Sequence, residues 1–246
     1  MLEKTLLTLA LLGLVTMPAQ ADTLLTLKSH QDAFEFQGQS QPAKDSTVEM
    51  WIGEGAIARD DDASRVVLAG DKLYLIDHRS QSYSVLDVPV DLAALLPAEM
   101  AEQLAQMRTQ ATIEAAVEPT DEEKQVGEWT SRRYDVSLSN KMGLQVDQVI
   151  WASELEGVDP AAYNRLTGAL AELQPGGAAW VSVLNEIKGF PVLRETTMRL
   201  GPEVAVTTTE TLTSVKTDVP APEGTFGPPA GYTEKEFRPG SQPGQS

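Results

Sequence analysis

The sequence contains no cysteine, which excludes disulfide bonds, thiolate chemistry, cysteine-based zinc sites and a lipidated N-terminal cysteine. It has only two histidines, His30 and His78, and neither has a companion at a metal-ligand spacing. Basic residues are scarce, because 19 lysines and arginines face 36 aspartates and glutamates, giving a formal net charge of −17. Nucleic acids and anionic lipid surfaces are bound by clustered positive charge. We therefore expect no metal ion and no nucleic-acid partner.

The familiar catalytic motifs are also missing. The sequence has no Gly-x-Ser-x-Gly, no His-Glu-x-x-His, no phosphate-binding Gly-x-x-x-x-Gly-Lys and no Gly-x-Gly-x-x-Gly for a dinucleotide. His30 and His78 lie among polar residues, which favours surface histidines over general bases. A hydrolase that uses two carboxylates far apart in the chain stays open as an alternative. The sequence thus predicts a non-enzymatic protein without a cofactor.

Residues 1–21 are predicted to be a secretory signal peptide. The apolar run 6–15 is too short to span a bilayer, and Ala19 and Ala21 form a small-x-small cleavage site. The mature chain would then begin at Asp22. No later stretch reaches about 18 uninterrupted apolar residues, so no transmembrane segment is expected in the mature chain. Export without cysteine indicates a bacterial periplasm or the cell exterior.

The mature chain is rich in short segments that alternate between apolar and polar residues, as half-buried antiparallel strands do. The predicted strands cover 23–37, 48–52, 65–68, 72–77, 82–86, 112–118, 127–138, 144–152, 190–200 and 203–217. The acidic run 121–123 is predicted at a hairpin tip, and Gly201-Pro202 is predicted to turn the last two strands. From Asp218 on, proline and glycine are so frequent that no regular structure is expected.

Three segments have helical signals. Over about 91–109, apolar residues recur at spacings of three or four and share one face: Leu92, Leu96, Met100, Leu104 and Met107. Pro97 is predicted to be the first residue of the main helix, 97–109, after a short turn at 91–95. Asp159 followed by Pro160 is typical of an N-cap and a first helical position, so a second helix is predicted to begin there. A third helix is predicted over 178–188, ending at Gly189. With no internal repeat and no linker, we predict a single α+β domain over 22–238 and a disordered tail over 239–246.

The order of several short motifs resembles a family of exported bacterial proteins of unknown function. The motifs are Gly70–Asp77, Ser82-Tyr83, Val149–Ala152, Gly189–Val192 and Pro229–Tyr232. The family shares the fold of the periplasmic lipoprotein carrier and its outer-membrane receptor, the LolA/LolB-like fold. The resemblance covers most of residues 23–233. It implies a curved, mostly antiparallel sheet of about 9–11 strands, a half-barrel wrapped around two or three helices with an apolar cavity between, and it carries over no functional residue.

The wide apolar faces of helices and strands supply the candidate binding residues. They are Met50, Ile52, Leu73, Leu75, Leu96, Met100, Leu104, Met107, Tyr134 and Ile150. If a cleft separates the sheet from the helices, these residues would line it and shelter a lipid, an acyl chain or another apolar molecule. If they fill a core instead, the protein is an interaction or structural protein of the envelope that binds an envelope protein and no apolar ligand. Periodicity alone leaves both readings open.

Overall fold

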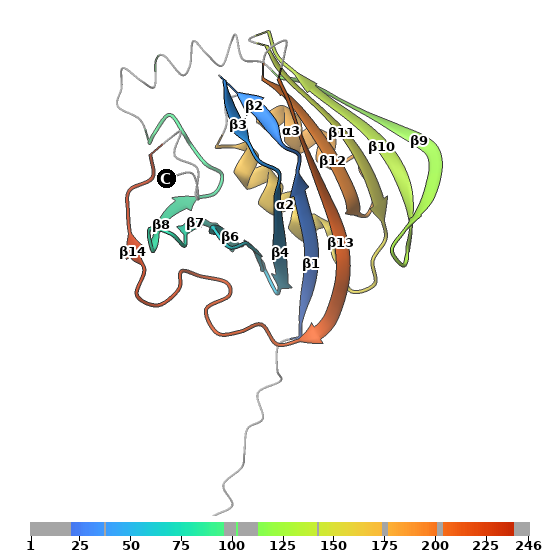
Figure 1. Cartoon of the computed structure of the whole chain (residues 1–246). Helices are drawn as coiled ribbons and strands as arrows, with labels where there is room; N and C mark the ends of the chain where they lie inside the picture. Colours follow the sequence, from blue (N-terminus) through green and yellow to red (C-terminus); the bar gives the residue numbers. More distant parts are fainter. Residues whose placement is uncertain are drawn as a thin grey trace, which may run out of the picture.

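The computed structural model describes residues 21–36, 38–95, 102, 113–141, 143–173, 177–200 and 204–238. In these ranges the protein is mostly β, with a large, mostly antiparallel sheet of twelve strands and two short helices (Figure 1). The predicted signal peptide up to residue 20 and the tail 239–246 lie outside the described residues. So does the predicted helix 97–109, apart from Glu102.

The sheet takes strands from almost the whole described chain. Its order is β14-β8-β7-β6-β5-β4-β1-β13-β12-β11-β10-β9. The strands are β1 (Asp22–Gln31), β4 (Lys44–Gly53), β5 (Ala56–Asp60), β6 (Ser64–Ala69), β7 (Lys72–Asp77), β8 (Ser82–Asp87), β9 (Glu114–Val126), β10 (Trp129–Ser139), β11 (Leu144–Ser153), β12 (Phe190–Leu200), β13 (Ala205–Val219) and β14 (Thr233–Glu234). A separate two-stranded hairpin consists of β2 (Phe34–Phe36) and β3 (Gln39–Gln41).

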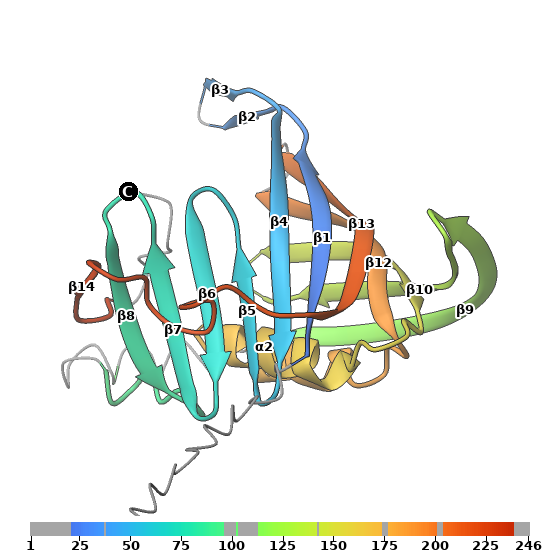
Figure 2. The same cartoon turned by 90° about the horizontal axis from the view of Figure 1, so that it is seen from below.

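The sheet is open, and it is neither curled nor closed, with β14 and β9 at its two ends. Neighbouring strands are antiparallel except β14 and β8, which pair in parallel. The sheet twists along its length, as right-handed strands impose, so that β9 and β10 run crosswise to β4 and β8 in Figure 2. The predicted half-barrel of 9–11 strands is therefore wrong. The sheet has twelve strands, and it is twisted and open instead of curving into a half-barrel.

Two predicted strands match the structure at both ends. The predicted strand 72–77 coincides with β7, and 190–200 coincides with β12. The prediction of a hairpin tip at 121–123 is wrong, because these residues lie within β9, where Glu123 pairs with Arg132 of β10 and Asp121 and Glu122 fall at a register shift. The chain turns later, at Gly127, whose φ of +58° favours glycine.

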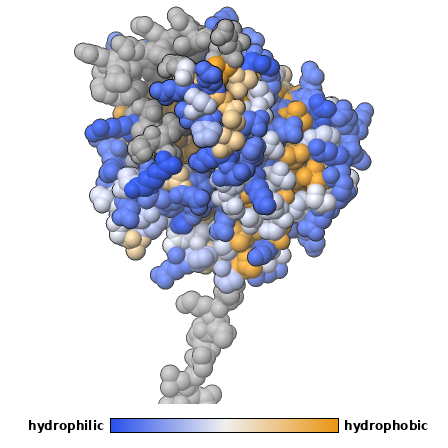
Figure 3. Space-filling model, viewed as in Figure 1, coloured by the Kyte–Doolittle hydropathy of each residue, from blue (hydrophilic) through white to orange (hydrophobic). Residues whose placement is uncertain are grey.

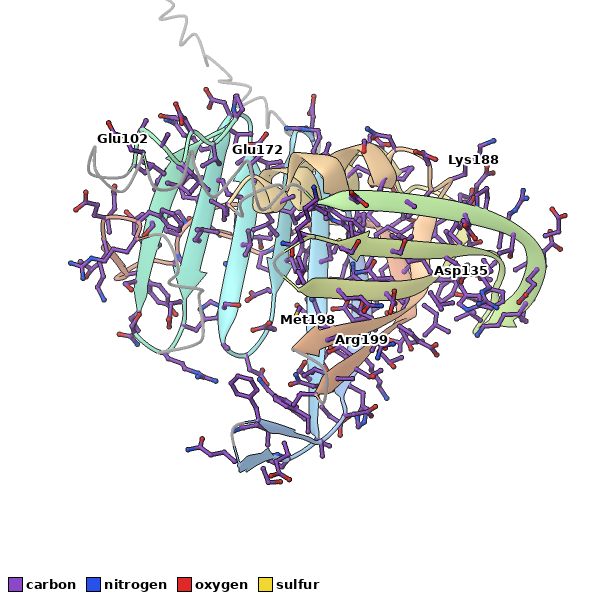
Figure 4. All side chains as sticks on the ribbon, turned by 90° about the horizontal axis from the view of Figure 1, so that it is seen from above. Glu102, Asp135, Glu172, Lys188, Met198 and Arg199 are labelled. Atoms are coloured by element: carbon purple, nitrogen blue, oxygen red, sulfur yellow. The ribbon has the colours of Figure 1, made fainter. Side chains whose placement is uncertain are left out.

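Both described helices lie on one face of the sheet, which we call the inner face. Helix α2 (Pro160–Ala171) begins as predicted, since the Asp159 side chain accepts a hydrogen bond of 2.9 Å from the Ala161 N–H. Helix α3 (Ala178–Leu184) is shorter than the predicted 178–188. Helix α2 packs against β5 and β6, and α3 packs against β9 and α2. After the end of α2, Glu172 accepts a 2.7 Å hydrogen bond from the Val90 N–H and ties this helix to the segment that follows β8 (Figure 4).

The core lies between the inner face and the helices, in two clusters. The larger cluster packs Tyr163, Leu166 and Ala169 of α2 against buried residues of β1 and β4 to β8. The smaller cluster packs Val183 and Ile187 against buried residues of β10 and β11. The burial of large side chains such as Leu25, Met50 and Leu166 supplies most of the stabilisation, at about 25 cal/mol per Å² of apolar surface.

The opposite, outer face is crossed by residues 220–238. Phe226 and Tyr232 from this segment pack against a small buried cluster of Ala58, Val67 and Ile76. The Tyr232 hydroxyl lies 3.0 Å from Nδ1 of His78, which fixes the segment to the turn after β7. The segment also contributes the two residues of β14, so the expectation of no regular structure after Asp218 holds only in part.

Candidate functional site

A charged cluster lies on the inner face within the apolar core. Arg194 of β12 and Glu210 of β13 are directly opposite in the antiparallel pairing, and their side chains form an ion pair. Nη2 of Arg59, on β5, lies 2.6 Å from Oε1 of the same carboxylate. Arg194 also donates a 2.8 Å hydrogen bond to the hydroxyl of Tyr163 on α2. We call Arg59, Tyr163, Arg194 and Glu210 the inner cluster.

The contact between Arg59 and Glu210 joins two halves of the sheet. Strands β4 and β1 lie between β5 and β13 in the strand order, so these two side chains meet over the intervening strands. A contact of this kind depends on the twist of the sheet and not on local pairing. It fixes β5 relative to β13 across the middle of the inner face.

The inner cluster is mostly buried and carries a net positive charge. The side chains of Glu210, Arg194 and Arg59 are 10%, 20% and 28% exposed. Burial alone would raise the pKa of Glu210, but Arg194 and Arg59 outweigh it and lower this pKa from 4.5 to about 2. Burial lowers the pKa of Arg194, whereas Tyr163 and Glu210 outweigh burial and raise it. At neutral pH two guanidinium groups thus share one carboxylate.

Two residues on the inner face, Arg59 and Gln148, have polar atoms without a partner in the described chain. Arg59 donates to Glu210 through Nη2 alone, and within the described chain its Nε and Nη1 have no acceptor. Gln148 of β11 pairs with Thr196, the next inward-facing residue after Arg194 on β12. The Oε1 atom of Gln148 is buried and has no hydrogen-bond partner. Buried polar groups are nearly always paired, so Oε1 of Gln148 leaves hydrogen-bonding capacity for another molecule on the inner face. The free donors of Arg59 add to this capacity, although they are not fully buried.

The wall around the inner cluster is apolar and closely packed. A small cavity beside the cluster is lined also by Leu27, Met50, Phe190 and Pro191. It leaves about 10 Å³ for the centre of a water molecule, which is room for about one water. The rings of Tyr163 and Phe190 meet edge to face with 5.2 Å between their centroids. A ligand at the inner cluster would therefore need this wall to move.

A partly exposed apolar residue lies on the same face. Met198 is 39% exposed, and in the strand pairing it lies opposite Val146 of β11 and Val206 of β13. In Figure 4 it lies near the middle of the view, at the end of β12. It is about 13 Å along β12 from Arg194, at about 3.3 Å per residue. Figure 3 shows that hydrophilic residues cover most of the surface in that view and that its hydrophobic patches are small.

The structure divides the predicted cavity residues between the two core clusters. Met50, Ile52, Leu73 and Leu75 belong to the cluster under α2, and Met50 also lines the small cavity. Tyr134 and Ile150 belong to the cluster under α3. The remaining four predicted residues, Leu96, Met100, Leu104 and Met107, lie outside the described residues.

Of the cleavage-site residues, Ala19 lies outside the described residues and Ala21 is exposed. Asp22 is the first residue of β1, and its carboxylate accepts a 2.9 Å hydrogen bond from the Ala221 N–H.

The histidines lie on the outer face, away from the inner cluster. Nδ1 of His30 lies 2.7 Å from Asp45, and this hydrogen bond is the largest of the effects that raise the pKa of His30. Nε2 of His78 lies 2.8 Å from Asp60, which also pairs with Arg65. Within the described ranges no three acidic or histidine side chains are placed to hold a metal ion. In the same ranges no helix has the length and apolarity to cross a membrane.

No family model matches the chain, and no curated protein is significantly similar to it in sequence. The resemblance to the LolA/LolB-like fold therefore stays a prediction that rests on the short motifs named above.

Proposed function

We propose that the mature protein is a non-enzymatic periplasmic protein that binds an apolar molecule, such as a lipid or an acyl chain, between the inner face and its helices. The observation that supports this proposal is the combination of unused polar groups on Arg59 and Gln148 with the partly exposed Met198 on one otherwise apolar face. A core that only stabilises the fold gains nothing from the unpaired Oε1 of Gln148, since a buried polar atom without a partner costs free energy.

A second candidate is an envelope interaction protein with a filled core and no apolar ligand. The packing favours this alternative, because Met50 and Leu73 are fully buried and the cavity beside the inner cluster is small. In that case the inner cluster only fixes β5 to β13. The partner would be an envelope protein that binds elsewhere on the surface.

A carboxylate-based hydrolase is supported least. Such an enzyme needs a carboxyl group that keeps its proton near neutral pH. Glu210 is the carboxylate of the inner cluster, and its lowered pKa of about 2 makes it a poor proton donor. Two arginines also hold both of its oxygen atoms.

Uptake of a fluorescent fatty acid tests the proposed function. The wild-type protein should bind it saturably, and Met198→Glu should weaken binding by about tenfold or more, since a charge would face the acyl chain. Met198 is partly exposed, so the variant should still fold. The matched control is Arg199→Gln on the adjacent residue, which faces the other way and lies 3.6 Å from Asp147.

Fluorescence titration of the three proteins gives the answer. The control should bind as the wild type does. No uptake by the wild-type protein, or equal uptake by Met198→Glu, contradicts binding on the inner face and favours the filled core.

A further inference from the structure

We propose that the inner cluster binds the anionic head group of the apolar ligand, a carboxylate or a phosphate, while the chain lies along the inner face toward Met198. This inference rests on the proposed function and adds the chemical class of the ligand. It predicts an amphiphile with a negative head and excludes neutral lipids as the preferred ligand.

The charge of the site is the first argument. Arg59 and Arg194 carry two positive charges against the single negative charge of Glu210, and all three side chains are mostly buried. Arg65, the next arginine along the chain, differs from these two because it has a carboxylate partner, Asp60, that balances its charge. An excess charge that is mostly removed from water is costly unless a counter-charge reaches it. A bound anion would balance the cluster.

The free hydrogen-bonding positions are the second argument. Glu210 accepts a hydrogen bond from Arg59 only at Nη2, so Nε and Nη1 of Arg59 have no acceptor in the described chain. A carboxylate or a phosphate offers only acceptors, as these donors require. Gln148 lies on β11, the strand next to β12. Its buried Oε1 atom would accept a hydrogen bond from a hydroxyl or an amide near the head group.

The apolar surroundings are the third argument. Leu27, Met50 and Phe190 line the cavity beside Arg59, so that a free inorganic anion would meet an apolar wall on several sides. An amphiphile places its chain against that wall and its charge against the arginines. The inner-face positions from Arg194 to Met198 run along one strand, in a direction that an extended chain can follow.

Glu210 is the counter-ion of both arginines when no ligand is bound. Its negative charge also repels a second anion at the same site. Glu210→Gln removes the repulsion and keeps the shape of the side chain. It should therefore strengthen the binding of an anionic amphiphile, whereas Arg59→Met, which keeps the apolar stem and removes the charge, should weaken it.

The test compares four compounds by calorimetry with the full mature chain: a fatty acid, an alkyl phosphate and a fatty alcohol of one chain length, and inorganic phosphate. In the wild-type protein the two anionic amphiphiles should bind about tenfold or more tightly than the alcohol. Arg59→Met should abolish that advantage and leave the affinity for the alcohol unchanged. Glu210→Gln should enlarge it. The control Arg199→Met, an exposed arginine on β12, should behave as the wild type does.

The outcomes separate the two proposals. If the alcohol binds as tightly as the acid and Arg59→Met changes neither, the protein binds apolar chains but the head-group inference is wrong. Inorganic phosphate that binds as tightly as the alkyl phosphate contradicts it too, since the site would then take a free anion. If no amphiphile binds, the proposed function itself fails. Should Arg59→Met not fold, Glu210→Gln decides alone: an unchanged or weaker affinity for the acid overturns the inference.

Discussion

The Glu210→Gln variant should lose about 3 kcal/mol of unfolding free energy at about pH 7, and the loss should disappear as the pH is lowered toward about 2. Glutamine keeps the volume of the side chain but leaves Arg59 and Arg194 mostly buried with no anion between them. Breaking a buried ion pair in this way is strongly destabilising.

The pH dependence follows from the direction of the pKa shift. Folding lowers the pKa of Glu210 from 4.5 to about 2, so the ionised carboxylate stabilises the folded state. This contribution is complete above about pH 5 and is lost as the pH falls through the folded pKa. Near that pH about half of the wild-type side chains are protonated and neutral, as glutamine is, so most of the difference in stability between the two proteins should be gone.

Urea unfolding of both proteins at a series of pH values is the measurement. Glu195→Gln is the matched control, because Glu195 is an exposed glutamate on β12, next to Arg194 and facing the other way. The control should change the unfolding free energy little at any pH. A loss in Glu210→Gln that stays constant down to about pH 2 would show that packing and not charge explains the effect.

Gly189→Ala should destabilise the protein by about 4 kcal/mol or more. Gly189 has a φ of +91°, which side chains with a Cβ rarely adopt, and an added Cβ would lie 2.5 Å from the carbonyl oxygen of Ser153. That oxygen belongs to the backbone of β11 and cannot rotate away. Ser153 pairs with Phe190, so the necessary shift would move the Phe190 ring against Tyr163 and disturb the inner cluster.

Gly143→Ala separates the two causes. Gly143 has a similar φ of +95°, but no atom of the described residues lies within 4 Å of an added Cβ there. This variant should lose only the conformational part, about 1–2 kcal/mol. Thermal or urea unfolding of both variants gives the comparison. Equal losses at the two sites would mean that the close approach to β11 has no energetic role.

The sequence predicted strands well where the core face and the solvent face alternate, and poorly where they do not. Strand β7 alternates and is bounded by turns, so its limits were predicted correctly. Residues 121–123 of β9 are charged on both faces, so no alternation marks them as a strand. Of these residues Glu123 pairs with Arg132 of β10, a tertiary contact that propensity does not report. The two residues of β14 are fixed in the same way, by β8.

The inner cluster was only partly within reach of sequence reasoning. The predicted two-residue turn at Gly201-Pro202 places Arg194 opposite Thr209, whereas the structure pairs Arg194 with Glu210, one residue further along. Opposite charges at facing positions of a hairpin form an ion pair, but this pair follows from the observed register and not from the predicted one. The helical pattern showed Tyr163 only as an apolar residue. Arg59 was out of reach, because its contact with Glu210 spans β4 and β1 and follows from the twist of the whole sheet.

Native mass spectrometry of the protein isolated without detergent from its own cell envelope tests the central claim most directly. The account predicts a species heavier than the polypeptide by the mass of one amphiphile, and fragmentation should identify a carboxylate or a phosphate head on an apolar chain. Release of that molecule should leave a polypeptide that begins at Asp22. A spectrum that contains only the bare polypeptide, from protein that also takes up no fatty acid afterwards, would contradict the account.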